Sequence, residues 1–114
     1  MADNKVEIKV SVMKRVTLIE VSGRIDSNNA NQLGEALNES IAGGHSQIVL
    51  DLSAVEYMSS AGLREMVAAL KKVKATGDLC LANPSERVQE VLELAGLDTI
   101  FKVFKSQVDA VGSF

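Results

Sequence analysis

The sequence is poor in the residues that build disulfides and structural metal sites. Its 114 residues include one cysteine, one histidine, one proline and no tryptophan. A single cysteine forms no disulfide within its own chain, and a structural zinc site takes about four ligands. We therefore expect no metal or other cofactor, and a hydrophobic core has to hold the fold together. With 46% hydrophobic and 24% charged residues, the composition predicts one globular domain over residues 1–114.

Positive charge and long apolar runs are also scarce. Twelve Lys and Arg against fifteen Asp and Glu give a net charge of −3. A nucleic-acid binder normally carries a basic surface, so a nucleic-acid partner is not expected. No apolar run approaches the ~20 residues that cross a bilayer, and no signal-peptide pattern opens the chain. These absences predict a cytoplasmic protein without membrane association, and we expect it to be a monomer when free.

The groups that enzymes use for catalysis are almost absent. No glycine-rich phosphate-binding loop occurs in the sequence. His45 follows Gly43 and Gly44 and precedes an apolar run, which is typical of a solvated turn. Cys80 lies within an apolar strand pattern and is interpreted as a small core residue. We therefore expect a protein that is not an enzyme.

The spacing of apolar residues predicts five strands. Residues 5–12 alternate strictly, with Val6, Ile8, Val10 and Val12 on one face, which indicates a half-buried strand. Four further strands are expected at residues 15–22, 47–52, 78–82 and 100–104. The second should pair with the first as a hairpin and end at Gly23. The run at 47–52 is nearly all apolar, as in a central buried strand.

Helices are expected between these strands. One begins near Ala30 and ends at Gly43, and the next follows Ser59 and Ser60 and ends before Gly77. A third is expected to start with Asn83 as its N-cap and Pro84 as its first residue, and residues 106–111 to add one or two closing turns. The predicted order is ββαβαβαβ(α), an α/β fold with a single mixed sheet of about five strands and about four helices. The polar first strand should lie at an edge.

Two aspartates follow or interrupt predicted strands. Asp26 comes directly after the second strand, and Asp51 interrupts the apolar run of the third, so we expect both to lie near the same edge of the sheet. A functional interpretation has them facing a ligand or partner. The alternative is that Asp26 helps to cap the first helix and that Asp51 hydrogen-bonds a neighbouring loop.

The segment from Tyr57 to Leu63 gathers small and hydroxyl-bearing residues before an amphipathic helix. A structural interpretation makes Ser59 or Ser60 the helix cap and gives Gly62 a packing role. A functional interpretation places a phosphate on a hydroxyl here, since free amides and the helix dipole favour an anion at a helix N-terminus.

Three segments carry a resemblance to a known family. They are GRID at residues 23–26, IVLDLSAVEYMSSAGL at 48–63 and VQEVLELAGL at 88–97. With them the chain resembles STAS-domain anti-sigma factor antagonists, the anti-anti-sigma proteins of bacterial partner-switching systems. The resemblance implies the STAS fold and a binding module without enzymatic activity.

The resemblance also implies a mechanism. The unmodified protein would bind an anti-sigma factor that is also a serine kinase of the GHKL type, and this would release the sigma factor. The kinase would then phosphorylate Ser60 with ATP and the complex would dissociate, until a PP2C-type phosphatase restored the active form. Ser59 stands where the family usually has Asp, and Ala61 where it usually has Ser or Thr. Ser59 is therefore kept as an alternative acceptor.

The expected partner-binding surface joins the start of the second helix to the loop before the first. Arg64 lies one helical turn beyond Ser60, where it could pair with a phosphate. Two other functions stay open: a STAS subunit or scaffold of a larger lipid-transport or stress-signalling assembly that phosphorylation does not control, and a small hydrolase using Ser60 and Asp26. The surface comprises Asp26, Ser27, Asn28, Ser59, Ser60, Ala61, Gly62 and Arg64.

Overall fold

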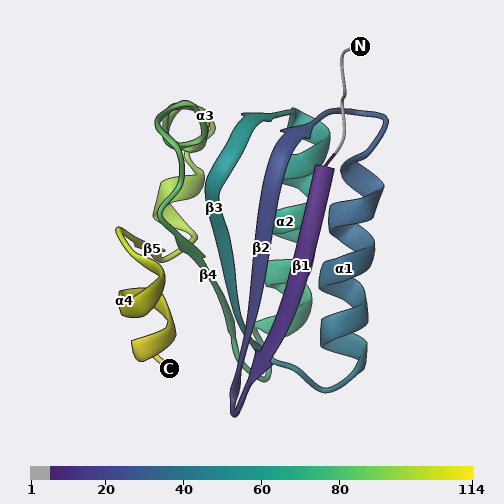
Figure 1. The fold of residues 1–114 in the computed structure, drawn as a ribbon, viewed down its shortest axis with the longest axis vertical. Coiled ribbons are helices and arrows are strands. Elements are labelled where there is room, and N and C mark those ends of the chain that lie inside the picture. Colours follow the sequence, from purple (N-terminus) through teal and green to yellow (C-terminus); the bar gives the residue numbers. More distant parts are fainter. Residues whose placement is uncertain (1–5) are drawn as a thin grey trace.

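A five-stranded sheet organises residues 6–114, the part of the chain that the computed structural model describes (Figure 1). β1 and β2 form an antiparallel hairpin, and β2, β3, β4 and β5 are parallel to one another. The sheet is therefore mixed, with β1 at its edge, and both predictions are confirmed. In spatial order the strands are β1 (Val6–Met13), β2 (Val16–Ile25), β3 (Gln47–Met58), β4 (Asp78–Ala82) and β5 (Val103–Phe104).

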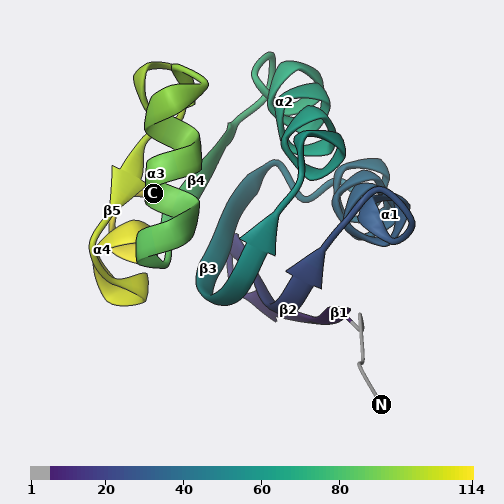
Figure 2. The same cartoon turned by 90° about the horizontal axis from the view of Figure 1, so that it is seen from above.

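Four helices cover this sheet unequally. α1 and α2 lie side by side on one face, whereas α3 and α4 gather at the side of β4 and β5 (Figures 1 and 2). This arrangement confirms the predicted order of elements, and the closing turns expected at 106–111 form α4. The helices are α1 (Ala30–Ala42), α2 (Ser60–Val73), α3 (Glu86–Leu94) and α4 (Gln107–Gly112), with a 3-10 turn at Leu97–Thr99.

Two apolar clusters fill the layers. The larger lies between the sheet and the helices α1, α2 and α3, and includes Leu33, Leu50 and Met66, all fully buried. The smaller lies under α4 and consists of Val16, Leu18, Val49, Ala82 and Ala110. Cys80 is 1% exposed, which confirms it as a core residue, and burial raises the pKa of its thiol. This is the opposite of the lowered pKa that a reactive cysteine needs.

Two strands run further than their sequence patterns predict. β2 continues past Ser22 to Ile25, and β3 continues past Leu52 to Met58, whereas Lys5 of the expected first strand lies outside the described residues. The pairing of β2 with β3 changes register between Glu20 and Ser22 and again after Gly23. A bulge interrupts the strict alternation of inward and outward residues. The sequence pattern therefore predicts only the first part of each strand, and both predictions end where the irregular pairing begins.

The start of α3 also differs from expectation. Asn83 has a φ of 48°, so it makes a left-handed turn after β4 instead of capping the helix. Ser85 is the N-cap, accepting the Val88 N–H at 3.4 Å while its own hydroxyl donates to the Val55 carbonyl at 2.6 Å. Asn tolerates the left-handed region, and Pro84 then only leads into the cap. The expected strand at 100–104 is reduced to β5, because the N–H groups of Ile100 and Phe101 both donate to the Leu97 carbonyl and hold the backbone in a turn.

Asp78 at the start of β4 makes the fold sensitive to acid. Burial by itself raises the pKa of this carboxyl, but hydrogen bonds from Lys74 and the Leu79 N–H, with the charges of Lys74 and Lys102, hold its pKa below the ordinary value of 3.8. The Lys74 and Lys102 ammonium groups lie 3.1 and 3.5 Å from its oxygens. A lowered folded-state pKa contributes stability above pH ~4, and this stability is lost as the pH falls through the folded pKa.

We expect Asp78→Asn to remove this acid-dependent contribution. The variant should be less stable than the wild type near neutral pH, and the two proteins should converge as the pH falls below ~4. Urea unfolding at about pH 6 and about pH 3 measures both gaps. A gap of the same size at the two pH values would contradict the assignment.

Within residues 6–114, no helix combines the length and the apolar character that crossing a bilayer requires. Over the same residues, no three His, Cys, Asp or Glu side chains come together so that they could hold a metal ion.

Candidate functional site at the start of α2

Ser59 and Ser60 have different structural roles at the start of α2. Ser59 is the N-cap: its Oγ accepts the Gly62 N–H at 3.2 Å, and its carbonyl accepts the Leu63 N–H at 3.1 Å. Ser60 is the first residue of the helix, and its side chain is exposed. The Ser59 hydroxyl is thus engaged with the helix backbone, whereas Ser60 is an exposed residue that another protein can reach.

Gly62 lets α2 begin directly against the ends of β2 and β3. A Cβ added at this position would lie 2.8 Å from Cγ2 of Ile25 and 2.5 Å from Sδ of Met58. Both neighbours are buried, at 0% and 2% exposure, so neither can move aside freely. Because Gly62 has no side chain, the first turn of α2 can pack closely against Ile25 and Met58, and this packing determines where Ser60 lies.

The loop between β2 and α1 is held by an exchange of hydrogen bonds. Asp26 Oδ1 accepts the N–H groups of Asn28 and Asn29 at 2.9 and 3.0 Å, and Asn29 Oδ1 accepts the Asp26 N–H at 2.8 Å. Asn29 Nδ2 also donates to the Arg24 carbonyl at 2.9 Å. Asp26 therefore organises the turn that leads into α1, but the N-cap of the helix is Asn29, and the Asp26 carboxylate bonds to N–H groups that precede the helix.

This loop lies next to the start of α2. The Ser59 N–H donates to the Ile25 carbonyl at 2.9 Å, one residue before Asp26. Asp26 is partly exposed, and Ser27 and Asn28 are exposed beside it. The structure thus brings the two predicted segments, 26–28 and 59–64, to one end of the sheet. Ala61 is partly buried, and Arg64 is exposed on the next turn of α2.

Asp51 lies away from this end of the sheet, so the expectation that it shares an edge with Asp26 is wrong. Asp51 pairs with Glu20 and Ala82 in the middle of the sheet, and β3 continues for seven residues to Met58, roughly 20 Å further on. Its oxygens accept from the Ser53 N–H and hydroxyl at 2.9 and 2.8 Å and from Gln107 Nε2 at 2.7 Å. Asp51 is therefore a hydrogen-bonding residue, as its structural interpretation predicted, but its partners lie on β3 and α4 and not on a loop.

An apolar groove runs from Ser60 along α2. It has a volume of about 580 Å³, and its α2 side follows a helical stripe of positions 60, 64, 67 and 71, whose spacing the sequence already shows. Its other side comes from the residues after α3, which only the folded chain places there. The groove is lined by Ser60, Leu63, Arg64, Val67, Ala68, Lys71, Ala95 and Leu97.

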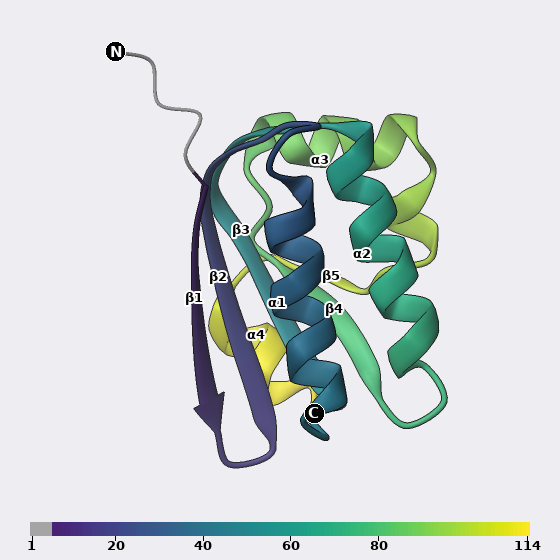
Figure 3. The ribbon, with the colours of Figure 1, turned by 90° about the vertical axis from the view of Figure 1, so that its right-hand side faces the viewer.

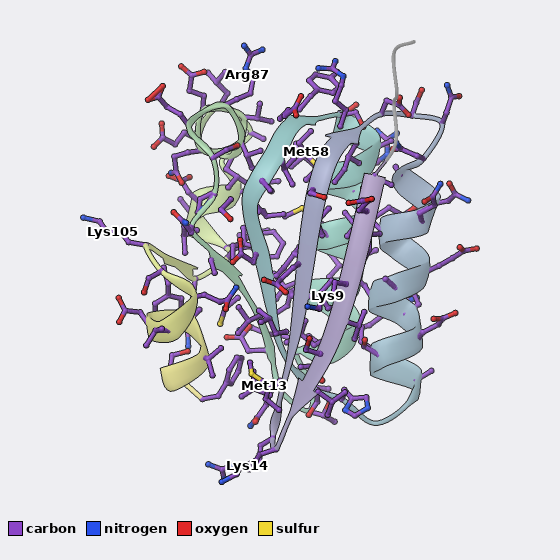
Figure 4. The ribbon with its side chains drawn as sticks, in the orientation of Figure 1. Lys9, Met13, Lys14, Met58, Arg87 and Lys105 are labelled. Atoms are coloured by element: carbon purple, nitrogen blue, oxygen red, sulfur yellow. The ribbon has the colours of Figure 1, made fainter. Side chains whose placement is uncertain are left out.

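An arginine and a tyrosine stack at the same end of the sheet. The Arg24 guanidinium carbon lies 4.7 Å from the centre of the Tyr57 ring, because the two residues are partners in the β2 and β3 pairing. Met58, the next residue, marks this end of β3 in Figure 4. The sequence does not predict this pair, since each residue comes from a different strand. The stacking holds a positive charge beside the Ser59 and Ser60 segment.

Comparison with known proteins identifies the fold family. The model of the STAS domain family matches residues 7–110. BtrV of Bordetella bronchiseptica, which is named as a candidate anti-sigma factor antagonist, is 36% identical over 95 residues, covering 82% of each chain. The anti-sigma-F factor antagonist RsfB of Mycobacterium tuberculosis is 29% identical over 110 residues, covering 96% of this chain and 90% of RsfB.

Solved structures agree with the sequence comparison. The crystal structure of an anti-sigma factor antagonist from Mycobacterium paratuberculosis superposes with a TM-score of 0.91 and 28% identity, over 98% of this chain and 96% of that one. Family model, sequence relatives and fold point the same way: the chain belongs to the STAS domain family, and its sequence and structure relatives include anti-sigma factor antagonists.

Proposed function

We propose that the protein is an anti-sigma factor antagonist whose binding surface is switched by phosphorylation of Ser60. The observation that carries the proposal is the exposure of Ser60 on the first turn of α2, where it is one of the residues that line an apolar groove. Its relatives RsfB and BtrV carry antagonist names, which supports the class of partner. In this proposal the unmodified protein binds an anti-sigma factor and releases the sigma factor.

The switch follows from charge and solvation. A phosphoserine adds about −1.5 to −2 charge, and burying that charge against an apolar or acidic partner surface carries a large desolvation cost. The groove beside Ser60 is lined by Leu63, Val67 and Leu97, so a partner seated there would exclude water from a phosphate on Ser60. Phosphorylation would therefore weaken the contact without unfolding the domain.

The first turn of α2 can hold the phosphate between cycles. The opening turn of a helix leaves amides without intrahelical acceptors and favours negative charge there. Arg64 is exposed one turn further along and can reach back toward a group on Ser60. Ser60 is preferred over Ser59 because the Ser59 hydroxyl is already bonded to the Gly62 N–H as the cap of α2.

The proposed partners follow from this cycle. The anti-sigma factor would itself be the serine kinase, of the GHKL type, and would transfer the γ-phosphoryl group of ATP to the Ser60 oxygen with release of ADP. A PP2C-type phosphatase would hydrolyse the phosphoserine and return inorganic phosphate. Asp26, Ser27 and Asn28 would complete the contact surface, since the Ser59 to Ile25 hydrogen bond holds their loop beside α2.

The test combines phosphorylation with binding. The purified protein is incubated with ATP and the anti-sigma factor encoded in the same genome, and the modified residue is mapped by mass spectrometry. We expect phosphate on Ser60, none on a Ser60→Ala variant, and stable binding only by the unmodified protein. Phosphate on Ser59 would overturn the residue assignment. Equal binding before and after modification would overturn the switch and favour a subunit or scaffold of a larger assembly.

A further inference from the structure

Among residues 6–114, the edge strand β1 has one neighbour in the sheet, β2, and its outer side is unpaired (Figure 3). It runs for eight residues, contains no proline, and pairs with β2 in one unbroken register from Val6 to Met13. A long regular edge strand presents free N–H and C=O groups to any strand of matching pattern. Soluble proteins commonly protect such an edge with a bulge, a proline or a charged side chain, and β1 has neither a bulge nor a proline.

The apolar face of β1 is incompletely covered. Val6, Ile8, Val10 and Val12 turn toward α1, yet Val10 is 46% exposed and Val12 is 58% exposed. Between the strand and α1 lies a groove of about 550 Å³, whose α1 side includes Glu35 and Glu39. The sequence alternation predicted a half-buried strand. In the structure, the part of its apolar face at Val10 and Val12 is exposed to solvent.

The opposite face of β1 carries alternating charges. Glu7 and Lys9 are both exposed, and Figure 4 shows Lys9 on the strand near the middle of the molecule. Single charges on an edge commonly prevent pairing. Here two opposite charges stand two residues apart, with Ile8 midway between them, and this spacing is self-complementary when the strand meets an antiparallel copy of itself.

We propose that two copies of this chain associate through β1, antiparallel, about a two-fold axis at Ile8. In that register Glu7 of each copy lies opposite Lys9 of the other, and Val6 lies opposite Val10. An axis at Lys9 would set the two lysines against each other, and an axis at Glu7 would set the two glutamates together. Opposite charges directly across a strand pair stabilise it and like charges destabilise it, so the charges select the register at Ile8.

The assembly would be a continuous ten-stranded sheet with two ion pairs on one face and Val6 packed against Val10 of the other copy on the opposite face. Its contact area is one strand per copy, well below the ~1,600 Å² of a standard interface, so we expect dimers at roughly 0.1 mM that dissociate on dilution. The monomer that the sequence predicts would then be the form present at low protein concentration. The proposal is independent of Ser60, since β1 and the start of α2 are separate elements.

The test uses charge reversal and mixing, read by sedimentation equilibrium from about 0.02 to 1 mM. Glu7→Lys makes the edge wholly basic, and Lys9→Glu makes it wholly acidic. We expect each variant alone to associate at least ~10-fold more weakly than the wild type, and their equimolar mixture to recover dimers of at least wild-type affinity. Glu90→Lys, on α3, makes the same change in net charge as Glu7→Lys but away from β1, and it should dimerise as the wild type does.

The mixing step distinguishes a weakened dimer contact from a variant that has lost its fold. Lys9 lies opposite Glu20 within its own sheet, so Lys9→Glu alone could loosen β1. Recovery of dimers in the mixture excludes that explanation. A wild type that stays monomeric at 1 mM, single variants that associate as the wild type does, or a mixture that fails to associate would each overturn the proposal.

Discussion

Ser60→Asp should lower the affinity for the anti-sigma factor at least ~100-fold, while Ser60→Ala should leave it within about threefold. The added carboxylate would lie in the groove that residue 60 lines with Leu63 and Val67, where a bound partner would remove its water. A 100-fold loss corresponds to about 2.7 kcal/mol, within the range for an uncompensated charge in a contact. Titration calorimetry with the purified anti-sigma factor measures both variants.

Neither change at Ser60 should unfold the protein. Ser60 is the first residue of α2, where an acidic side chain is stabilised by the helix dipole. Ser59→Ala is the matched control: it removes the cap bond to Gly62 and should lower the free energy of unfolding by about 1 kcal/mol, with no charge added to the contact. If Ser60→Asp and Ser60→Ala bind equally well, the electrostatic switch is wrong.

Gly77→Ala should lower the free energy of unfolding by about 2–4 kcal/mol, the largest stability loss we expect from one added methyl group. A Cβ at Gly77 would overlap the carbonyl oxygen of Ser46 and lie 2.6 Å from its carbonyl carbon. That carbonyl accepts the Asp78 N–H at 2.9 Å, so the backbone cannot separate without breaking the bond. Overpacking costs ~1–3 kcal/mol, and a lost backbone hydrogen bond adds to it.

Thermal and urea unfolding measure this loss, which corresponds to a fall in Tm of roughly 10 °C. Gly112→Ala is the matched control, because a Cβ there meets nothing within 4 Å. Gly112 ends α4, so the control should be neutral or slightly stabilising. If the two alanine variants have the same stability, the close approach to Ser46 does not limit this turn.

The sequence was informative wherever one periodicity ran without interruption. The strict alternation of residues 6–12 predicted β1, and the apolar spacing of Leu63, Met66 and Leu70 predicted α2. The predictions failed where the backbone departs from regular pairing. The register shifts between β2 and β3 concealed the last six residues of β3, and with them the true distance between Asp26 and Asp51.

For the site, the sequence supplied the chemistry but only part of the geometry. It placed Ser59, Ser60 and Gly62 at a helix start, and it placed the Asp26 loop at the end of a strand. It offered no means of pairing Arg24 with Tyr57 or of bringing Ala95 and Leu97 alongside α2. Those contacts join segments distant in sequence, and only the three-dimensional packing of the elements creates them.

The placement of α4 has a consequence for how the chain is made. Ala110 completes the small cluster with Val16, Leu18, Val49 and Ala82, yet it follows all five strands in the order of synthesis. A nascent chain can finish the layer of α1 and α2 while this second face of the sheet is still bare. Until α4 leaves the ribosome, three apolar side chains of β2 and β3 are open to chaperones and to neighbouring nascent chains.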